Sequence, residues 1–259
     1  MEYQNISFEK VDTIGMITLN RPGRNNALSI ALIGEMNCLL AGIAASREVK
    51  VLIVKAAGKN FCAGHDLTDL AGKDINICNS MFSTCSEMML RLQRLPQPVI
   101  AQVQGVATAA GCQLVASADL AVAAEDAGFA APGGKAGWFC HTPMVAVARN
   151  VGRKRGAELA LSGDVIDART ALDWGLVNRV VPAAQLDSAV RDLLDRVTRG
   201  SAESKGIGKQ ALYAQIDLDQ PKAYAYAIEV MAATSQLPDA REGMQSFLEK
   251  RKPRWRRGR

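Results

Sequence analysis

The sequence predicts an α/β protein: a mostly parallel sheet with crossover helices, followed by a helical C-terminal lobe. Strand-like and helix-like runs alternate through roughly the first seventy per cent of the chain, and from Pro182 onward the pattern is helical throughout. The 259 residues suit one large domain, or one domain with an appendage. We therefore expect a core at residues 1–195 and a helical lobe with a basic tail at residues 196–259, which covers the core or mediates oligomerisation.

Strands are expected where branched apolar residues crowd together between turn signals. Four such runs lie at 15–22, 49–58, 99–105 and 119–125. The second is a continuous run of Val, Leu and Ile, which is typical of a strand buried on both faces. A further strand is expected at the end of 163–182, after a short helix that stops at Gly175.

Helices are expected where apolar residues recur with helical spacing. One spans 27–45 with Ser29 near its start, and another spans about 79–95 and stops before Pro96. A third opens in the small-residue turn after the strand at 99–105. The helices of the C-terminal lobe are expected to break at three positions, near Gly200, Gln220 and Pro238.

The composition is that of an ordinary soluble globular protein, with 48% hydrophobic and 22% charged residues. No apolar run approaches the ~18 residues that a membrane span needs. The opening segment, MEYQNISFEK, has no targeting pattern, so we expect a cytoplasmic protein without a membrane partner. Six cysteines lie scattered in apolar settings and are expected to be free thiols of a reducing compartment.

The net charge of +5 is concentrated at the C-terminus, where the last ten residues, KRKPRWRRGR, hold seven basic side chains. The remainder carries about −2, so the body of the protein is not a basic platform and a nucleic-acid partner is not expected. The tail itself is either a solvated end or a contact for RNA, an anionic surface or a ligand phosphate.

Two small-residue turns follow strands directly: GKNFCAGHDL at 58–67 and TAAGCQLVAS at 108–117. Open α/β sheets bind ligands at the carboxyl ends of their strands, and small residues let a ligand approach the backbone closely. Backbone N–H groups in such turns can point at a developing oxyanion, and the second turn adds the positive end of a helix. Taken singly, each turn is better explained as an ordinary tight connection.

Taken together, the segments from about Thr13 to Pro253 resemble the enoyl-CoA hydratase/isomerase (crotonase) superfamily, through ITLNRPGRNNALS, VLIVKAAGKNFCAGHDL, PVIAQVQGVATAAGCQLVASADLAVA, FAAPGGKAG, GLVNRVVP and FLEKRKP. The combination of AGHDL, TAAGCQLVAS and FCHTP looks most like the enoyl-CoA hydratase domain-containing 3 branch. The resemblance implies a crotonase-like β/β/α spiral core that binds acyl-CoA thioesters, assembled as a homotrimer or a dimer of trimers. It implies no metal and no permanently bound cofactor, with coenzyme A present as part of the substrate.

The resemblance also implies an oxyanion hole for the thioester carbonyl. Its two donors match the backbone N–H of His65, after the AG of the first turn, and the backbone N–H of Ala110, in the second turn. The chemistry agrees, because enolate-like charge on a thioester oxygen needs two convergent donors in a site that excludes water.

Hydratases of the superfamily use two glutamates, and the matching positions here are Gln113 and Gly133. An amide can orient a water molecule or a substrate carbonyl, but it has no usable proton equilibrium, and glycine has no side chain. General acid–base catalysis contributes roughly 10²–10⁴-fold to a rate. Efficient hydration of the usual kind is therefore not expected.

Some members of the superfamily place a catalytic aspartate eight residues beyond the second glutamate, and the matching residue here is His141. The pair Thr142-Pro143 is typical of an N-cap followed by the first helical residue, which would put His141 just before a helix. The positive end of that helix favours a neutral imidazole that can accept a proton. The alternative is a structural histidine in the pocket wall, and the side chain of His65 poses the same choice.

For coenzyme A, the resemblance implies backbone contacts to the adenine from the first turn, at Ala63, Asp66 and Leu67. Arg24 lies in the RPGRN turn, which borders the nucleotide in the superfamily. Two positions near the C-terminus match residues that reach the nucleotide of a neighbouring subunit, Phe247 and Lys250. Lys250 fits a solvated basic tail equally well.

The resemblance and the missing glutamates leave three main candidate functions, with an RNA-binding role as a fourth. The first is an acyl-CoA lyase or isomerase that acts by stabilising an enolate. The second is a catalytically silent acyl-CoA-binding or regulatory protein, because both carboxylates are missing, and the third is an acyl-CoA thioesterase. An RNA-binding role ranks lowest because the basic charge is terminal. Few aromatic residues and many Ala, Met and Leu suit an aliphatic acyl pocket, although the same composition describes a core.

Overall fold

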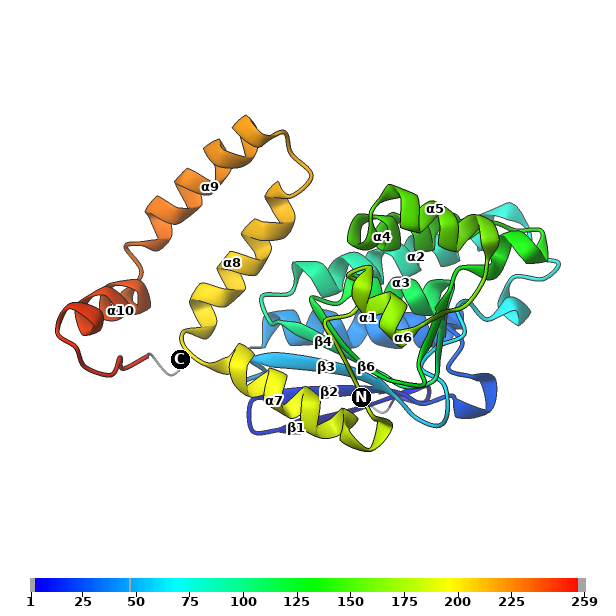
Figure 1. Cartoon of the computed structure of the whole chain (residues 1–259), viewed down its shortest axis with the longest axis horizontal. Helices are drawn as coiled ribbons and strands as arrows, with labels where there is room; N and C mark the ends of the chain where they lie inside the picture. The colour runs from blue at the N-terminus through cyan, green and yellow to red at the C-terminus, as the bar shows by residue number, and fades with distance from the viewer. Residues whose placement is uncertain (1–2, 47, 256–259) are drawn as a thin grey trace.

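The computed structural model describes residues 3–46 and 48–255. Its centre is a six-stranded sheet in the order β1-β2-β3-β4-β6-β9 (Figure 1). β1 pairs antiparallel with β2, and each later neighbour pairs parallel, which confirms the mostly parallel sheet expected from the sequence. The strands of this sheet are β1 (Ile6–Val11), β2 (Ile14–Leu19), β3 (Val51–Ala56), β4 (Val99–Val103), β6 (Leu120–Ala124) and β9 (Arg179–Val181).

A smaller sheet joins three short strands in the order β5-β7-β8. They are β5 (Val106–Thr108), β7 (Gly128–Ala130) and β8 (Ile166–Asp167). The sequence patterns predicted none of these three and also missed β1. Strands of two or three residues leave no periodicity to detect, and β1 is an edge strand whose side chains are largely exposed, so it lacks the apolar run that marks a buried strand.

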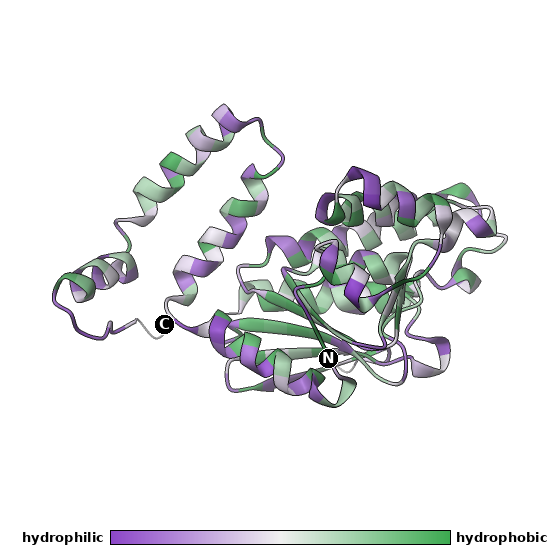
Figure 2. Ribbon diagram, viewed as in Figure 1, coloured by the Kyte–Doolittle hydropathy of each residue, from purple (hydrophilic) through white to green (hydrophobic). Residues whose placement is uncertain are grey.

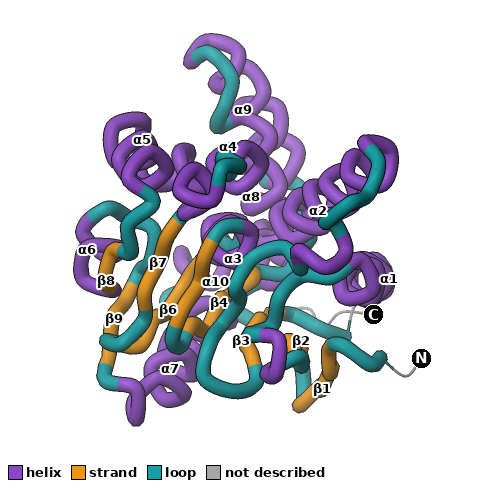
Figure 3. Tube along the Cα trace, turned by 90° about the vertical axis from the view of Figure 1, so that its right-hand side faces the viewer, coloured by secondary structure: helices purple, strands orange, loops and turns teal. Residues whose placement is uncertain are grey.

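Helices cover both faces of the six-stranded sheet, with α1, α2 and α3 on one side and α7 on the other (Figure 3). The helices are α1 (Ile30–Ala45), α2 (Ile75–Arg94), α3 (Ala110–Ser117), α4 (His141–Val151), α5 (Arg153–Ser162), α6 (Ala168–Asp173), α7 (Leu186–Thr198), α8 (Ala202–Gln215), α9 (Gln220–Thr234) and α10 (Pro238–Leu248). The crossover arrangement and the helical C-terminal region are those that the sequence predicts.

Strand β3 contributes side chains to the apolar clusters on both faces of the six-stranded sheet. Val51 and Ile53 belong to the apolar cluster beneath α7, whereas Leu52 and Val54 belong to the cluster beneath α1 to α3. Successive side chains of a strand point to opposite faces, so a strand covered on both sides needs an unbroken apolar run. This confirms the buried strand expected at 49–58.

The predicted helix boundaries shift where a local contact decides them. Ser29 caps α1 as expected, because its Oγ accepts the N–H of Leu32 at 3.2 Å. The helix begins at residue 30 and not at residue 27, since Leu28 forms a β-bridge with His65. α2 starts earlier than residue 79 because Asp74 caps it through two backbone N–H groups.

Helices α8 to α10 form a C-terminal arm (residues 202–248) that reaches away from the sheet (Figure 1). The three predicted breaks are confirmed: the one near Gly200 separates α7 from α8, and those near Gln220 and Pro238 separate the helices of the arm. Lys209 of α8 holds the arm to the core: its Nζ lies 2.7 Å from a carboxylate oxygen of Asp119 and donates to the carbonyl oxygens of Leu92 and Gln97 at 2.8 and 2.9 Å. The predicted boundary after residue 195 falls in the last turn of α7.

The arm carries apolar side chains that the chain itself leaves uncovered, and Figure 2 shows hydrophobic stretches along the ribbon of α9. Ile228 and Met231 of α9 are 61% and 77% exposed, and Phe247 of α10 is 83% exposed. Exposed apolar surface of this kind marks interaction sites. Within residues 3–46 and 48–255, no helix combines the length and apolar character that crossing a membrane requires.

Candidate active site

The two small-residue turns meet directly. Cys62 and Ala107 form an isolated parallel β-bridge, in which the N–H of Thr108 donates to the carbonyl oxygen of Cys62 at 2.9 Å. Gly111 at the start of α3 lies against the same residue, because a Cβ added to it would fall 2.8 Å from the Cβ of Cys62 and closer still to its carbonyl oxygen. Only glycine permits this approach.

This close contact brings together two backbone N–H groups without acceptors. Among the described residues, no oxygen accepts the N–H of His65 or of Ala110, the first residue of α3. A Cβ built on Gly64 would lie 3.3 Å from the nitrogen of Ala110, so the residue before His65 is in contact with the second donor. Such a pair of donors fits an oxyanion.

Ala109, immediately before this helix, has a strained backbone with φ of +50°. An L-residue with a side chain disfavours that region, and such strain persists only where the surroundings impose it. Here the N–H of Ala109 donates to the carbonyl oxygen of Ala130 at 2.8 Å, and its own carbonyl accepts the N–H of Gln113 at 3.0 Å. The strain sits at the residue that aims the N–H of Ala110.

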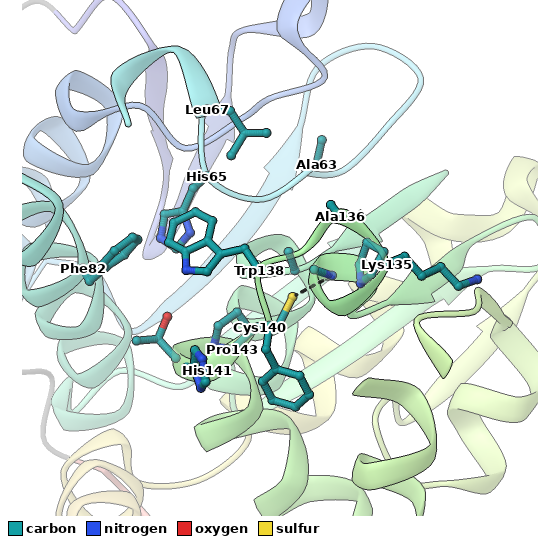
Figure 4. Close-up of a pocket in the computed structure, with 15 residues that line it drawn as sticks. Ala63, His65, Leu67, Phe82, Lys135, Ala136, Trp138, Cys140, His141 and Pro143 are labelled. Carbon is teal, nitrogen blue, oxygen red and sulfur yellow. Dashed lines mark hydrogen bonds between the residues drawn. The ribbon is translucent and has the colours of Figure 1, made fainter. Parts of the chain in front are cut away.

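A pocket of about 540 Å³ opens beside these donors (Figure 4). Its walls come from the first turn, from α2 and from residues 132–143. Five of the positions singled out in the sequence line it: Ala63, His65, Leu67, Gly133 and His141. Ala110 is fully buried behind Ala109, which does line the pocket.

The remaining predicted residues lie elsewhere. Asp66, in the first turn, forms an ion pair with Arg24, and Gln113 is buried within α3. Phe247 ends up on α10 and Lys250 just beyond it, at the far end of the C-terminal arm (Figure 1). The structure of one chain therefore does not bring Phe247 and Lys250 to the pocket.

His65 contributes an aromatic wall as well as a backbone donor. Its ring lies 5.2 Å from the ring of Phe82 in an edge-to-face arrangement. Burial lowers the pKa of its imidazole to about 4, so the ring is neutral at neutral pH. Its Nε2 is buried and has no hydrogen-bond partner in the described structure.

Gly133, at the position of the second glutamate, is closed to any side chain. A Cβ there would fall 2.8 Å from the Sγ of Cys140 and closer still to the carbonyl oxygen of Trp138. The N–H of Gly133 donates to the Sγ of Cys140 at 3.3 Å, the dashed line in Figure 4. The backbone of residues 138–140 thus occupies the space that a side chain at position 133 would need.

Gln113, at the position of the first glutamate, is 4% exposed, and its Oε1 is buried without a hydrogen-bond partner in the described structure. A buried unsatisfied oxygen costs about 1–3 kcal/mol. Gln113 does not line the pocket, so this cost falls on the interior of α3.

The prediction that His141 lies just before a helix is wrong, because α4 begins at His141 with Cys140 as its N-cap. Proline needs no hydrogen-bond acceptor anywhere in the first helical turn, so Thr142-Pro143 does not determine where the helix starts. The His141 ring is exposed at the pocket and lies 5.2 Å from the ring of Phe139.

Asp66 is a brace within the first turn. Its carboxylate oxygens lie 2.9 Å from a guanidinium nitrogen of Arg21 and 3.1 Å from one of Arg24. Burial alone would raise the pKa of Asp66, but hydrogen bonds from Thr68, Arg21 and Arg24 outweigh it and hold that pKa well below its usual range. The backbone N–H of Asp66 is also engaged, by the carbonyl oxygen of Leu28 at 2.9 Å.

The cysteines near the site are buried. Burial raises the pKa of the Cys112 thiol to about 12 and also raises the pKa of Cys140. Both are therefore protonated at neutral pH and poor nucleophiles. Within the described ranges, no group of three or more His, Cys, Asp or Glu residues is arranged to hold a metal ion.

Sequence reasoning missed the side chains that shape the pocket, namely Phe82, Trp138, Phe139 and Lys135. Phe82 lies in an amphipathic helix among Met81 and Cys85, where an aromatic residue normally signals core. Trp138 was close to a quoted motif, but nothing in one sequence shows that its ring faces a cavity.

Comparison with known proteins shows which family the chain belongs to. Residues 9–258 match the family model for enoyl-CoA hydratase/isomerase. The chain is 40% identical over 252 residues to the mouse (Mus musculus) protein named "Enoyl-CoA hydratase domain-containing protein 3, mitochondrial", covering 96% of this chain and 83% of the mouse protein. It is 31% identical to the short-chain-enoyl-CoA hydratase of Clostridium acetobutylicum, covering 97% of each.

Solved structures of the same family share the fold of this chain. The crystal structure of human enoyl-CoA hydratase domain-containing protein 3 superposes with a TM-score of 0.94 at 39% identity, over 97% of this chain and all of that one. An enoyl-CoA hydratase of Mycobacterium smegmatis superposes with a TM-score of 0.95 at 41% identity, over 97% of this chain and 99% of that one.

Proposed function

Since the chain belongs to the enoyl-CoA hydratase/isomerase family, we propose that it binds acyl-CoA thioesters and acts on them as a lyase or isomerase through an enolate. The observation that carries the proposal is the pair of unpartnered backbone N–H groups, His65 and Ala110, beside an apolar pocket. Two fixed donors stabilise negative charge on a thioester oxygen without reorganisation, which is the largest single contribution in many enzymes.

The proposed step is proton abstraction from the α-carbon of the acyl group. The α-carbon–hydrogen bond breaks, the proton moves to the imidazole of His141, and the electron pair passes to the thioester oxygen. The N–H groups of His65 and Ala110 hold the resulting enolate. When His141 exchanges its proton with solvent and returns one to the α-carbon, the α-hydrogen is exchanged. In an acyl chain with a β,γ-double bond, delivery of the proton to the γ-carbon instead moves the double bond to the α,β-position.

His141 is the proposed base because of what else lines the pocket. The lining contains no carboxylate within the described residues, and Lys135 is engaged in an ion pair with Asp164. His65 is a weak base, given the low pKa of its ring. A conventional two-glutamate hydration is disfavoured, because Gly133 has no room for a side chain.

The same missing carboxylates favour a second candidate, an acyl-CoA-binding protein without turnover. Hydrogen–deuterium exchange at the α-carbon distinguishes the two without knowledge of the acyl group. The full-length protein is incubated with butyryl-CoA and with phenylacetyl-CoA in D2O, and mass spectrometry follows deuterium in the thioester and any release of free coenzyme A.

Exchange above the protein-free rate supports enolate chemistry. Binding of the thioesters by calorimetry without exchange refutes it in favour of the silent protein. Release of free coenzyme A without exchange refutes it in favour of a thioesterase. No binding of either thioester at millimolar concentration refutes the assignment of acyl-CoA as ligand.

We further propose that the chain assembles as a homotrimer or a dimer of trimers through its C-terminal arm. The exposed apolar residues of α9 and α10 support this, as does the distance of Phe247 and Lys250 from their own pocket, since in an assembly they would serve the nucleotide of a neighbour. Light scattering measures the assembly mass, and a monomer would refute the proposal. Cytoplasmic location stays a prediction, because the vertebrate relatives are named mitochondrial.

A further inference from the structure

The pocket gathers aromatic rings to a degree that the composition does not explain. Phe, Trp and Tyr make up 5% of the chain, yet Phe82, Trp138 and Phe139 are three of the 15 lining residues. Both histidines of the sequence line the pocket as well. Five of the 15 lining residues therefore carry an aromatic ring.

These rings are arranged in contact with one another. His65, Phe82 and Trp138 form a continuous row, with ring centroids 5.2 and 5.4 Å apart and interplanar angles of 74° and 60°. The members come from the first turn, from α2 and from residues 132–143, three separate segments of the chain. The contact between His65 and Phe82 is edge-to-face and that between Phe82 and Trp138 is tilted. Aromatic contacts at such distances are favourable and hold each ring in place. Figure 4 shows the row along one side of the pocket.

A pocket for a flexible alkyl chain would have a different lining. Met adapts to such chains because its side chain is unbranched and has three rotatable bonds. Among the residues that line this pocket there is no Met, Ile or Val, and the single large aliphatic side chain, Leu67, is largely exposed. α2 points its methionines, Met81 and Met88, into the core and Phe82 into the pocket.

We infer that the acyl group carries an aromatic ring, which lies against the row of His65, Phe82 and Trp138. The inference rests on the proposed function, because it assigns the acyl part of a coenzyme A thioester to this pocket. The row offers an aromatic ligand contacts between ring faces and edges in addition to apolar area, and a saturated ring of the same size gains only the area.

The test compares two ligands that differ only in that respect, phenylacetyl-CoA and cyclohexylacetyl-CoA. They share the thioester, the nucleotide and the number of carbon atoms. Calorimetry on the full-length protein measures the dissociation constant of each and that of free coenzyme A. Phenylacetyl-CoA is expected to bind about tenfold more tightly, although the cyclohexyl group is the more hydrophobic.

Matched variants locate the preference. Phe82→Leu and Trp138→Leu should each bring the ratio of the two constants toward one and leave the affinity for free coenzyme A unchanged. Phe8→Leu, an aromatic substitution on β1 outside the pocket lining, should keep the full ratio. Trp138 is 47% exposed, so its substitution removes little core packing, and thermal unfolding verifies that each variant folds.

The outcomes separate the inference from the function on which it rests. Equal or tighter binding of cyclohexylacetyl-CoA, or tighter binding of hexanoyl-CoA than of phenylacetyl-CoA, overturns the aromatic acyl group and leaves acyl-CoA binding intact. A ratio that survives both pocket substitutions overturns the role of the ring row. Failure to bind any thioester overturns the proposed function as well.

Discussion

One wall of the pocket is made of backbone and another is made of side chains. The backbone wall, at His65 and Ala109 with the N–H of Ala110 behind it, depends on glycine contacts and a strained alanine that lock two turns together. The side-chain wall, at residues 132–143, carries aromatic rings and the exposed His141, and it leaves no space for a side chain at Gly133.

The difference teaches which parts of such a site can change independently. Donors that belong to the main chain are retained as long as the turns keep their shape, whatever the side chains are. Proton-transfer groups belong to side chains, so they can be replaced without disturbing the fold. Under the proposed function, the ligand class would depend on the backbone donors and the reaction class on the side chains, and each region can be tested alone.

The largest effect is expected in the side-chain wall. His141→Ala should lower the rate of α-proton exchange by roughly 10²–10⁴-fold, the usual contribution of a general base, with thioester affinity within about twofold because His141 is exposed and makes few contacts. His141→Asn, which keeps a hydrogen-bonding side chain without a comparable proton equilibrium, should behave like the alanine variant. Exchange at the wild-type rate in both variants would remove His141 from the reaction.

The backbone wall is expected to show its largest effect in stability. Gly111→Ala should lower the free energy of unfolding by about 3 kcal/mol, since the new Cβ overlaps the backbone of Cys62 deep in the interior. Chemical denaturation measures this. Gly34→Ala is the matched control: it lies on an exposed position of α1 with no atom near its Cβ, and should stabilise by up to ~1 kcal/mol. Similar values for both would mean that the turns are not locked.

The two walls meet at His65, whose ring makes stability depend on pH. The pKa is lowered to about 4 from 6.5, so between these values the unfolded chain binds a proton that the folded chain does not. Stability should therefore fall as the pH drops from about 6.5 to 4, by about 2–3 kcal/mol for this partly exposed residue. Denaturation midpoints measure the slope. His65→Leu should flatten it, and an unchanged slope would contradict burial of a neutral ring.

Gly133→Ala repeats the Gly111 test in the side-chain wall. The clash is similar, but Trp138 and its neighbours lie near the surface and can shift, so we expect a loss of about 1–2 kcal/mol. Gly133→Glu, which restores the glutamate of the family, should still fail to hydrate crotonyl-CoA in a spectrophotometric assay. Hydration by that variant would show that the wall accommodates the carboxylate after all.

The smallest effect is expected at Gln113. Gln113→Met replaces a buried amide with an apolar side chain of similar size, and the oxygen that it removes has no partner in the described structure. The free energy of unfolding should stay the same or rise by up to about 1 kcal/mol. The dissociation constant for phenylacetyl-CoA should change by less than about twofold, because Gln113 does not line the pocket. A large loss of stability would show that the amide is needed inside the fold, and a large loss of affinity would show that it reaches the ligand.

The sequence reveals the backbone wall better than the side-chain wall, for physical reasons. The small residues at 108–111 indicate a close backbone approach, because few larger residues permit it. A single aromatic residue such as Phe82 in an amphipathic helix indicates only that this face of the helix is packed. The aromatic row forms only when three segments far apart in the sequence come together. Low aromatic content favours an aliphatic pocket, whereas three of the aromatic residues, Phe82, Trp138 and Phe139, line the pocket together.

The same limit applies to the fold. Long apolar runs such as 49–58 predict the central strands, because burial on both faces demands an unbroken pattern. The short strands β5, β7 and β8 depend on pairing between distant segments and leave no local signal. The start of α4 at His141 was misplaced because proline marks the first helical turn and not a single position in it.

The contact of Lys209 with the core has a consequence for assembly. Its ammonium group is tied at once to Asp119 and to two carbonyl oxygens near the end of α2, so the direction in which α8 leaves the sheet is set within each monomer. An extended segment that is already oriented loses less conformational freedom on association than one that must be ordered by its partner. In the proposed trimer, the orientation of the arm would thus be preorganised, with part of the entropic cost of assembly met during folding.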